Sequence, residues 1–154
     1  MIDSPLIVFL NTYGVVILFV LVSLYIWFYE RKKEEVLHVI FAAIIASIIA
    51  LVLKDLLGIP RPFLSDGKPP LAGYTNLQSF PSLHTTLAFS LATTVALHQR
   101  KTGILVFLLA ALIGIGRVAA NLHYPIDIAG GAVLGTVASL FTEKIHFSIS
   151  RKRG

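Results

Sequence analysis

Three short polar fragments interrupt a chain that is otherwise strongly apolar: Lys54–Pro62, Pro81–His84 and Arg117–Asp127. Each lies at the end of a hydrophobic stretch, and together they supply two histidines, three basic residues and an aspartate that follows one of the histidines. Transfer of a phosphoryl group requires cations around its equatorial oxygens, an in-line nucleophile and an acid for the leaving oxygen. The fragments contain a candidate for each of these tasks.

The first fragment offers two cations, Lys54 and Arg61, seven residues apart. Lys54 lies near the end of an apolar helix, and Arg61 stands in a Pro-Arg-Pro turn that restricts its backbone. Arginine binds phosphate oxygens in a bidentate manner, whereas lysine supplies a compact charge. Either residue alone is also typical of a side chain that extends to the membrane interface, but the two together predict an anion site.

The second fragment begins a helix, because proline suits the first turn and Ser82 is a preferred N-cap residue. A helix N-terminus also presents free amide groups to an anion. A purely structural cap is one interpretation of Ser82. His84 stands in the same first turn and, beside the cations, is a candidate general acid.

The third fragment places His123 and Asp127 four residues apart, with Pro125 between them as a first-turn residue of the next helix. The carboxylate can accept a hydrogen bond from one ring nitrogen, which leaves the other nitrogen free to attack. A polar couple that only caps the helix is the alternative. Arg117, six residues before His123, favours the anion site.

A metal site was the main competing interpretation, since two histidines and an aspartate fit a three-ligand catalytic zinc site. We expect no metal among these residues, because three cations at the same place would repel a divalent ion. The chain has no cysteine, which excludes disulfides and zinc sites built on cysteine clusters.

The elements that must position these residues are membrane-spanning helices. The chain has 154 residues, is 56% hydrophobic and has a mean hydropathy of +0.82, which is too apolar for a soluble domain. The sequence predicts one all-α integral membrane domain over residues 1–154, with no internal repeat. The first apolar run is interpreted as a retained span rather than a signal peptide. Five segments are long enough to cross the bilayer: residues 5–29, 36–57, 82–98, 104–121 and 125–147.

Five spans place all three fragments on one face of the membrane. That face has four basic residues, Lys54, Arg61, Lys68 and Arg117, and the other face has nine. The positive-inside rule makes the second face cytoplasmic, so we expect the site on the extracytoplasmic side of the cell (inner) membrane. The nine are Arg31, Lys32, Lys33, Arg100, Lys101, Lys144, Arg151, Lys152 and Arg153.

The remaining features receive structural interpretations. The net charge of +5 comes from loop residues that meet lipid headgroups, with no basic helix face for nucleic acid. The loop over residues 58–81 is rich in proline, which predicts an extended segment, either a lid or a connector. Histidines near the cytoplasmic ends have no evident partners and are interpreted as interface residues. They are His38, His98 and His146, and glycines that predict close helix packing are Gly114, Gly116, Gly131 and Gly135.

The order and spacing of the fragments resemble the three-part signature of the type 2 phosphatidic acid phosphatase superfamily. The matching residues are Lys54-x6-Arg61-Pro62, Pro81-Ser82-x-His84 and Arg117-x5-His123-x3-Asp127, within residues 54–127.

The resemblance implies a helical bundle and a two-step hydrolysis without metal or cofactor. In that scheme His123 forms a phosphohistidine, Asp127 orients it and His84 protonates the leaving group. The implied phosphate-binding residues are Lys54, Arg61, Ser82, Leu83 and Arg117.

Two positions depart from the family pattern. Leu83 replaces a common glycine and bears on how closely the backbone approaches the phosphate, and Gly116 replaces a common serine and removes one hydroxyl donor. Membrane members of the family often have six spans, one more than expected here.

The sequence therefore predicts an integral membrane lipid phosphatase. Its candidate substrates are undecaprenyl diphosphate, phosphatidylglycerophosphate, phosphatidic acid and lipid A 1-phosphate, and its surroundings are bilayer lipids. Two alternatives stay open, a lipid phosphotransferase with the same site and a non-catalytic protein that binds or moves lipid. The intact set of His84, His123 and Asp127 argues against the second. The oligomeric state is not determined by the sequence.

Overall fold

The computed structural model describes residues 5–31, 33–68 and 76–151. Within these ranges the chain is helical, with no strand and a single isolated bridge between Pro60 and Gln78. The elements are α1 (Pro5–Tyr25), the π-helical turn η1 (Ile26–Glu30), α2 (Lys33–Leu57), α3 (Pro62–Asp66), α4 (Leu83–His98), α5 (Arg100–Ala119) and α6 (Pro125–Arg151).

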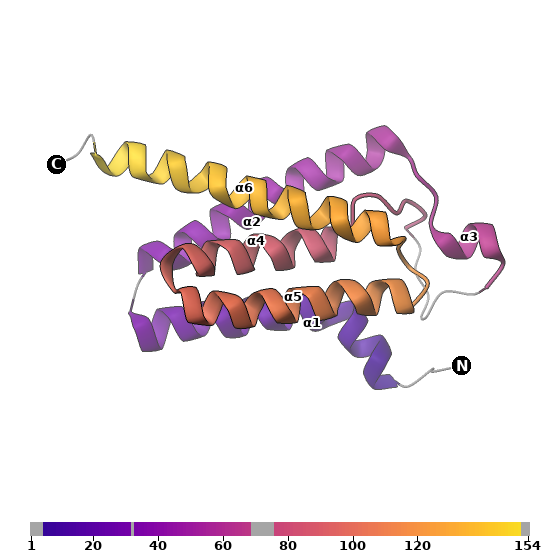
Figure 1. Cartoon of the computed structure of the whole chain (residues 1–154), viewed down its shortest axis with the longest axis horizontal. Coiled ribbons are helices and arrows are strands. Elements are labelled where there is room, and N and C mark those ends of the chain that lie inside the picture. Colours follow the sequence, from indigo (N-terminus) through magenta and orange to yellow (C-terminus); the bar gives the residue numbers. More distant parts are fainter. Residues whose placement is uncertain (1–4, 32, 69–75, 152–154) are drawn as a thin grey trace.

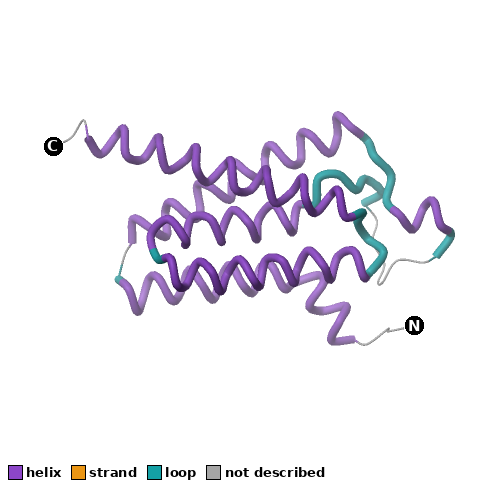
Figure 2. The backbone as a smooth tube through the Cα atoms, in the orientation of Figure 1, coloured by secondary structure: helices purple, strands orange, loops and turns teal. Residues whose placement is uncertain are grey.

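The five long helices run alternately in opposite directions along one axis, with α4 inside the bundle (Figure 1). α4 packs most extensively on α6, and also on α5 and α2. The long α2–α4 connection and the α5–α6 turn lie at one end of the bundle (Figure 2). This arrangement brings all three polar fragments to the same end, as the alternation of spans predicts.

In the part of the chain that the structure describes, four helices are long and apolar enough to cross a membrane. The sequence predicts five, but α4 has 16 residues and reaches only about 24 Å, less than the roughly 30 Å of a hydrocarbon core. α4 is enclosed by the other helices, so its full length need not meet lipid. The chain is a multi-pass membrane protein. The four candidate spans are Asn11–Tyr29, Glu34–Leu57, Arg100–Ala119 and Pro125–Ile145.

Small residues allow α6 to lie directly against α4. A Cβ atom built on Gly135 would overlap the carbonyl oxygen of Thr86 and lie 2.8 Å from the amide nitrogen of Ser90. A Cβ atom on Gly131 would lie 2.8 Å from the carbonyl oxygen of Ser82. Close contact between helices in a membrane depends on such residues, so the packing role predicted for both glycines is confirmed.

The loop after α2 is not extended throughout, contrary to the expectation from its prolines. It contains the short helix α3, because Pro62 occupies the first helical position, where a fixed φ is suitable and no N–H is needed. Gly67 ends this helix with a φ of +69°. Pro69, Pro70 and Tyr74 of the same loop lie outside the described residues.

The prediction that His38 and His98 have no partners is wrong. Nδ1 of His38 lies 2.7 Å from Oε2 of Glu143 and 3.2 Å from Nε2 of His98. The three residues come from α2, α4 and α6, so nothing in their sequence spacing indicates the contact. The side chain of His146 is outside the described part of the chain.

Candidate active site

The loop end of the bundle collects the residues that the three fragments predict. Six of them are buried, with at most 4% of their surface exposed, while Leu83 and His84 are partly buried. Arg61 and Arg117 lie close enough to both histidines to interact with them electrostatically. The six buried residues are Lys54, Arg61, Ser82, Arg117, His123 and Asp127.

His123 has a defined tautomer. Nη1 of Arg61 lies 3.3 Å from Nε2 of His123, and a guanidinium only donates hydrogen bonds. Nε2 therefore carries a lone pair, and the ring hydrogen sits on Nδ1. That nitrogen lies 3.2 Å from Oδ2 of Asp127 and donates to it. Asp127 is completely buried and also accepts a 2.8 Å hydrogen bond from the amide of Tyr124.

The surroundings also keep the His123 ring neutral. Burial lowers its pKa from 6.5 to about 4, the Asp127 hydrogen bond opposes this shift, and the charges of Arg61 and Arg117 reinforce it. A neutral imidazole with a lone pair on Nε2 is a nucleophile at ordinary pH. The contact pairs the two residues for which the sequence predicts an attacking role, His123, and an orienting role, Asp127.

Backbone carbonyl groups hold the cations of the first fragment in place. Nζ of Lys54 donates to the carbonyl oxygens of Gln78 and Ser79, at 3.2 and 2.9 Å. Nη1 of Arg61 donates to the carbonyl oxygen of Leu122 at 2.9 Å. A buried cation is stable only when such partners replace water. The Lys54 contacts link the end of α2 to the segment that precedes α4, and the Arg61 contact links the start of α3 to the turn that carries His123.

The first helix completes the site, although the sequence pattern does not single it out. Nη1 of Arg117 donates to the carbonyl oxygen of Asn11 at 2.8 Å, and Nε2 of His84 to that of Thr12 at 3.2 Å. The first turns of α1 bend away from the rest of the helix at this end (Figure 1). Because a carbonyl only accepts, Nε2 of His84 carries a hydrogen, and the ring becomes a general acid when Nδ1 is protonated as well.

Ser82 is the N-cap of α4, which confirms the structural cap as one of the two interpretations of this residue. Its Oγ accepts from the amide of Thr85 at 3.5 Å and from the hydroxyl of Thr85 at 3.1 Å. A serine hydroxyl also has one hydrogen to donate, so capping and anion binding are compatible. The amide of Ser82 donates to the carbonyl oxygen of Asp127 at 3.1 Å, which joins the start of α4 to the start of α6.

A second link to the His123 turn was not predicted. Nδ2 of Asn121 donates to the Asp66 carboxylate at 3.2 and 3.1 Å, so α3 is tied to the residues just before His123. The backbone N–H of Lys68 and the Asn121 amide hold the pKa of Asp66 below its usual value. Asn121 has a φ of 58°, a conformation that asparagine tolerates better than most residues. The tendency of asparagine to adopt this conformation in turns was the sequence signal that could have indicated a role for Asn121.

The two departures from the family pattern lie in different places. Leu83 is the first residue of α4 and partly buried. Gly116 faces α1, where a Cβ atom would lie 3.8 Å from Oδ1 of Asn11, an ordinary contact distance. A serine would therefore fit at position 116 without moving the backbone.

Comparison with known proteins shows which family the chain resembles. The PAP2 superfamily model matches residues 35–151, which include all the site residues. Bacitracin transport permease protein BcrC of Bacillus licheniformis is 34% identical over 90% of this chain and 69% of its own length. Undecaprenyl-diphosphatase BcrC of Bacillus subtilis is 30% identical over 87% of this chain and 70% of its own length.

Two solved structures share the architecture. Aquifex aeolicus LpxE superimposes with a TM-score of 0.74 at 29% identity, over 92% of this chain and 87% of that one. A transmembrane PAP2-type phosphatidylglycerolphosphate phosphatase from Bacillus subtilis has a TM-score of 0.70 at 24% identity, over 96% and 80% of the two chains, and shows the same fold. The chain described here belongs to the PAP2 superfamily.

Proposed function

We propose that the chain hydrolyses undecaprenyl diphosphate to undecaprenyl phosphate through a phosphohistidine on His123, without a metal ion. The broader statement, a hydrolase that acts on membrane lipids, follows from the family and the relatives. The observation that carries the mechanism is the contact between Arg61 and His123, because it leaves a lone pair on Nε2 beside a cation.

In the first step the Nε2 lone pair attacks the terminal phosphorus. The bond from phosphorus to the bridging oxygen breaks, and His84, which must enter this step as the doubly protonated imidazolium, gives its Nε2 proton to that oxygen, so undecaprenyl phosphate leaves. The positive charge that forms on the His123 ring is stabilised by Asp127 through the Nδ1 hydrogen bond. In the second step water attacks phosphorus and loses a proton to His84, the N–P bond breaks and inorganic phosphate leaves.

The cations stabilise the charge on the transferring phosphoryl group. Arg61 already touches the nucleophilic nitrogen, and Arg117 donates to a backbone carbonyl in the same region, where a phosphate oxygen would be a stronger acceptor. The first-turn amides of Leu83 and His84 and the Ser82 hydroxyl add neutral donors.

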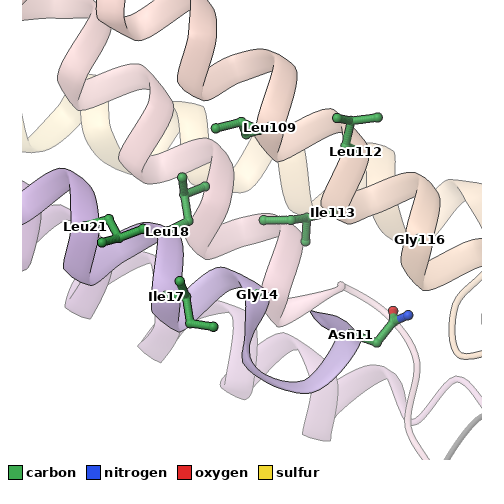
Figure 3. Close-up of a pocket in the computed structure, with 9 residues that line it drawn as sticks. All are labelled: Asn11, Gly14, Ile17, Leu18, Leu21, Leu109, Leu112, Ile113 and Gly116. Carbon is green, nitrogen blue, oxygen red and sulfur yellow. The ribbon is translucent and has the colours of Figure 1, made fainter. Parts of the chain in front are cut away.

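An apolar groove between α1 and α5 is the proposed path for the prenyl chain (Figure 3). It has a volume of about 460 Å³, and Asn11 and Gly116 lie at one of its ends. Asn11 is also the residue whose carbonyl contacts Arg117. A lipid in the groove would therefore have its chain against Leu18 and Leu112 and its headgroup near the cations.

The substrate assignment is tested by phosphate release from a panel of purified lipids in detergent. We expect undecaprenyl diphosphate to have the highest kcat/KM, because relatives named for that activity include the Bacillus subtilis BcrC and a Sulfolobus acidocaldarius enzyme. The panel also contains phosphatidylglycerophosphate, phosphatidic acid and lipid A 1-phosphate. A preference for any of these would overturn the assignment but leave the mechanism intact.

Phosphotransfer to a lipid hydroxyl uses the same residues and is separated by the same assay. Hydrolysis predicts release of inorganic phosphate with no acceptor lipid present, whereas a phosphotransferase releases none. One relative is named as a transport permease, so we also test whether the chain is a protein that binds or moves lipid. Such a protein would bind the lipid without turnover in the unmodified chain.

The location of the site on the extracytoplasmic side is also part of the proposal. Exposed Arg31, Arg100, Lys101 and Lys144 lie toward the end of the bundle opposite His123, which supports that end as cytoplasmic. The chain has no cysteine, so single cysteines can be labelled selectively. We expect a membrane-impermeant maleimide to label Lys68→Cys in intact cells or spheroplasts, and Lys101→Cys only after lysis.

A further inference from the structure

We propose that His38, His98 and Glu143 form a binding site for a divalent metal ion of the zinc class, at the opposite end of the bundle from His123. His38 lies in the second turn of α2, His98 is the last residue of α4, and Glu143 lies on α6. Three helices distant in sequence thus place three good metal ligands at one point, and none of them takes part in the proposed phosphatase chemistry.

The distances between the ligand atoms are close to those of a zinc site. Nδ1 of His38, Nε2 of His98 and Oε2 of Glu143 are separated by 3.2, 2.7 and 3.6 Å. In a tetrahedral site with metal–ligand bonds of about 2.0–2.1 Å, the ligand atoms lie about 3.3 Å apart. The three observed separations bracket that value. The two imidazole rings meet edge to face at 83°, so both nitrogens point toward the carboxylate without the rings stacking.

Hydrogen bonds satisfy the three ligand atoms of His38, His98 and Glu143 only in part. A proton on Nδ1 of His38 satisfies the 2.7 Å contact with Glu143, and Nε2 of His98 at 3.2 Å can then only share that proton, since it lies 3.6 Å from Oε2 of Glu143. A metal ion at the centre gives each of the three atoms a positive partner at once, and binding it releases that proton.

The charge around the triangle favours a cation. Glu35 is buried on α2, one turn before His38, and accepts from Nε2 of Gln99 at 3.2 and 3.5 Å. The two carboxylates can therefore balance the charge of a divalent ion, and the two imidazoles bind it as neutral ligands. The basic residues that follow in sequence, Arg100, Lys101 and Lys144, are exposed and can extend into solvent.

The site has an open side through which an ion can enter. The His38 side chain is 1% exposed, whereas those of His98 and Glu143 are 26% and 15% exposed. Three protein ligands with one accessible position leave room for water as a fourth ligand.

The test is metal binding by the purified full-length chain, isolated with an affinity tag that contains no histidine and stripped with a chelator. Titration with Co²⁺, followed by visible absorption, and with Zn²⁺, followed by calorimetry, should show one equivalent bound. Glu143→Gln keeps the shape of the side chain, and we expect it to weaken binding about 10- to 100-fold by loss of the anionic ligand. His98→Ala should have at least the same effect, and its position at the end of α4 makes it the variant least disruptive to folding.

The control removes the other histidine pair. The double variant His84→Ala/His123→Ala should bind the metal as tightly as the unmodified chain. No binding by the unmodified chain would overturn the proposal and identify the cluster as a hydrogen-bonded His–Glu pair. If Glu143→Gln and His98→Ala bound the metal as tightly as the unmodified chain, the proposal would be overturned and the ion would lie elsewhere. Loss of binding in the double variant would have the same meaning.

Discussion

The two ends of this bundle contain nearly the same groups, two histidines and a carboxylate, but in opposite electrostatic surroundings. Near His123 the neighbours are buried cations, and a guanidinium faces the ring nitrogen at 3.3 Å. Near His38 the ring nitrogen faces a carboxylate at 2.7 Å, and a second carboxylate, Glu35, is buried close by in the sequence. Imidazole binds either kind of partner, so the fixed charges around it select an anion at one end and a cation at the other.

The strongest test of the anion-binding end is His123→Ala. We expect hydrolysis to fall by about 10⁴-fold or more, because the nucleophile is lost. The variant should still fold, since its neighbours Arg61 and Asp127 keep backbone partners. The measurement is the initial rate of phosphate release, with trapping of the phosphoenzyme at alkaline pH as a second readout. Retention of activity in His123→Ala would contradict the proposed mechanism.

Asp127→Asn tests the role of the carboxylate in this set. The amide oxygen can still accept from Tyr124 and His123, but the negative charge that stabilises the ring during attack is lost. We expect kcat to fall by about 100-fold with a smaller change in KM. Asp55→Asn is the matched control, because it alters an exposed carboxylate in the last turn of α2, at the same end of the bundle. An equal loss in both variants would contradict a specific role for Asp127.

Arg61→Gln tests how the cations tune His123. Neutral His123 is the active form, so with a pKa of about 4 the acidic limb of kcat/KM should lie well below pH 6.5. Removing the Arg61 charge raises the pKa of His123 and moves that limb to higher pH, and we expect the rate at pH 7 to fall about 10- to 100-fold. Lys68→Gln, which alters an exposed cation, should leave the limb in place. An acidic limb near pH 6.5 in the unmodified chain would contradict the neutral, buried histidine.

Gly135→Ala tests the packing that connects the two ends. The added methyl group would overlap the carbonyl of Thr86, and backbone cannot move aside cheaply, so we expect a loss of about 1–3 kcal/mol in stability. Gly14→Ala is the control, because a Cβ atom there meets nothing within 4 Å. Thermal unfolding in one detergent compares the two variants. Equal unfolding temperatures would show that α4 and α6 are less tightly packed than described.

Chelation should produce the smallest change in rate and separates the two ends most directly. We expect a chelator to change initial hydrolysis by less than about 2-fold, because the cations near His123 exclude a metal. The same treatment should lower the unfolding temperature by removing the ion from His38, His98 and Glu143. Loss of activity that returns on adding metal would place a metal ion in the catalytic step.

Much of the site could be predicted because it depends on residues that are only a few positions apart in the sequence. His123 and Asp127 are four residues apart across a helix start, and Ser82 precedes an apolar run, so each relation follows from helix geometry alone. The membrane spans follow from apolar length and composition, apart from α4, whose short length is tolerated by its enclosure within the bundle. The loop helix α3 was missed because proline both begins helices and breaks them.

The sequence by itself determined which segments are helices in the membrane, which residues carry charge, and that three polar fragments share one end. The tertiary structure alone decided which groups face each other across helices: Arg61 against His123, the carbonyls of α1 against Arg117 and His84, and His38 and His98 against Glu143. The physical reason is that spacing within a helix repeats every 3.6 residues and is visible along the chain. Contacts between helices depend on how the helices are rotated and packed, which here is set by small residues such as Gly131 and Gly135.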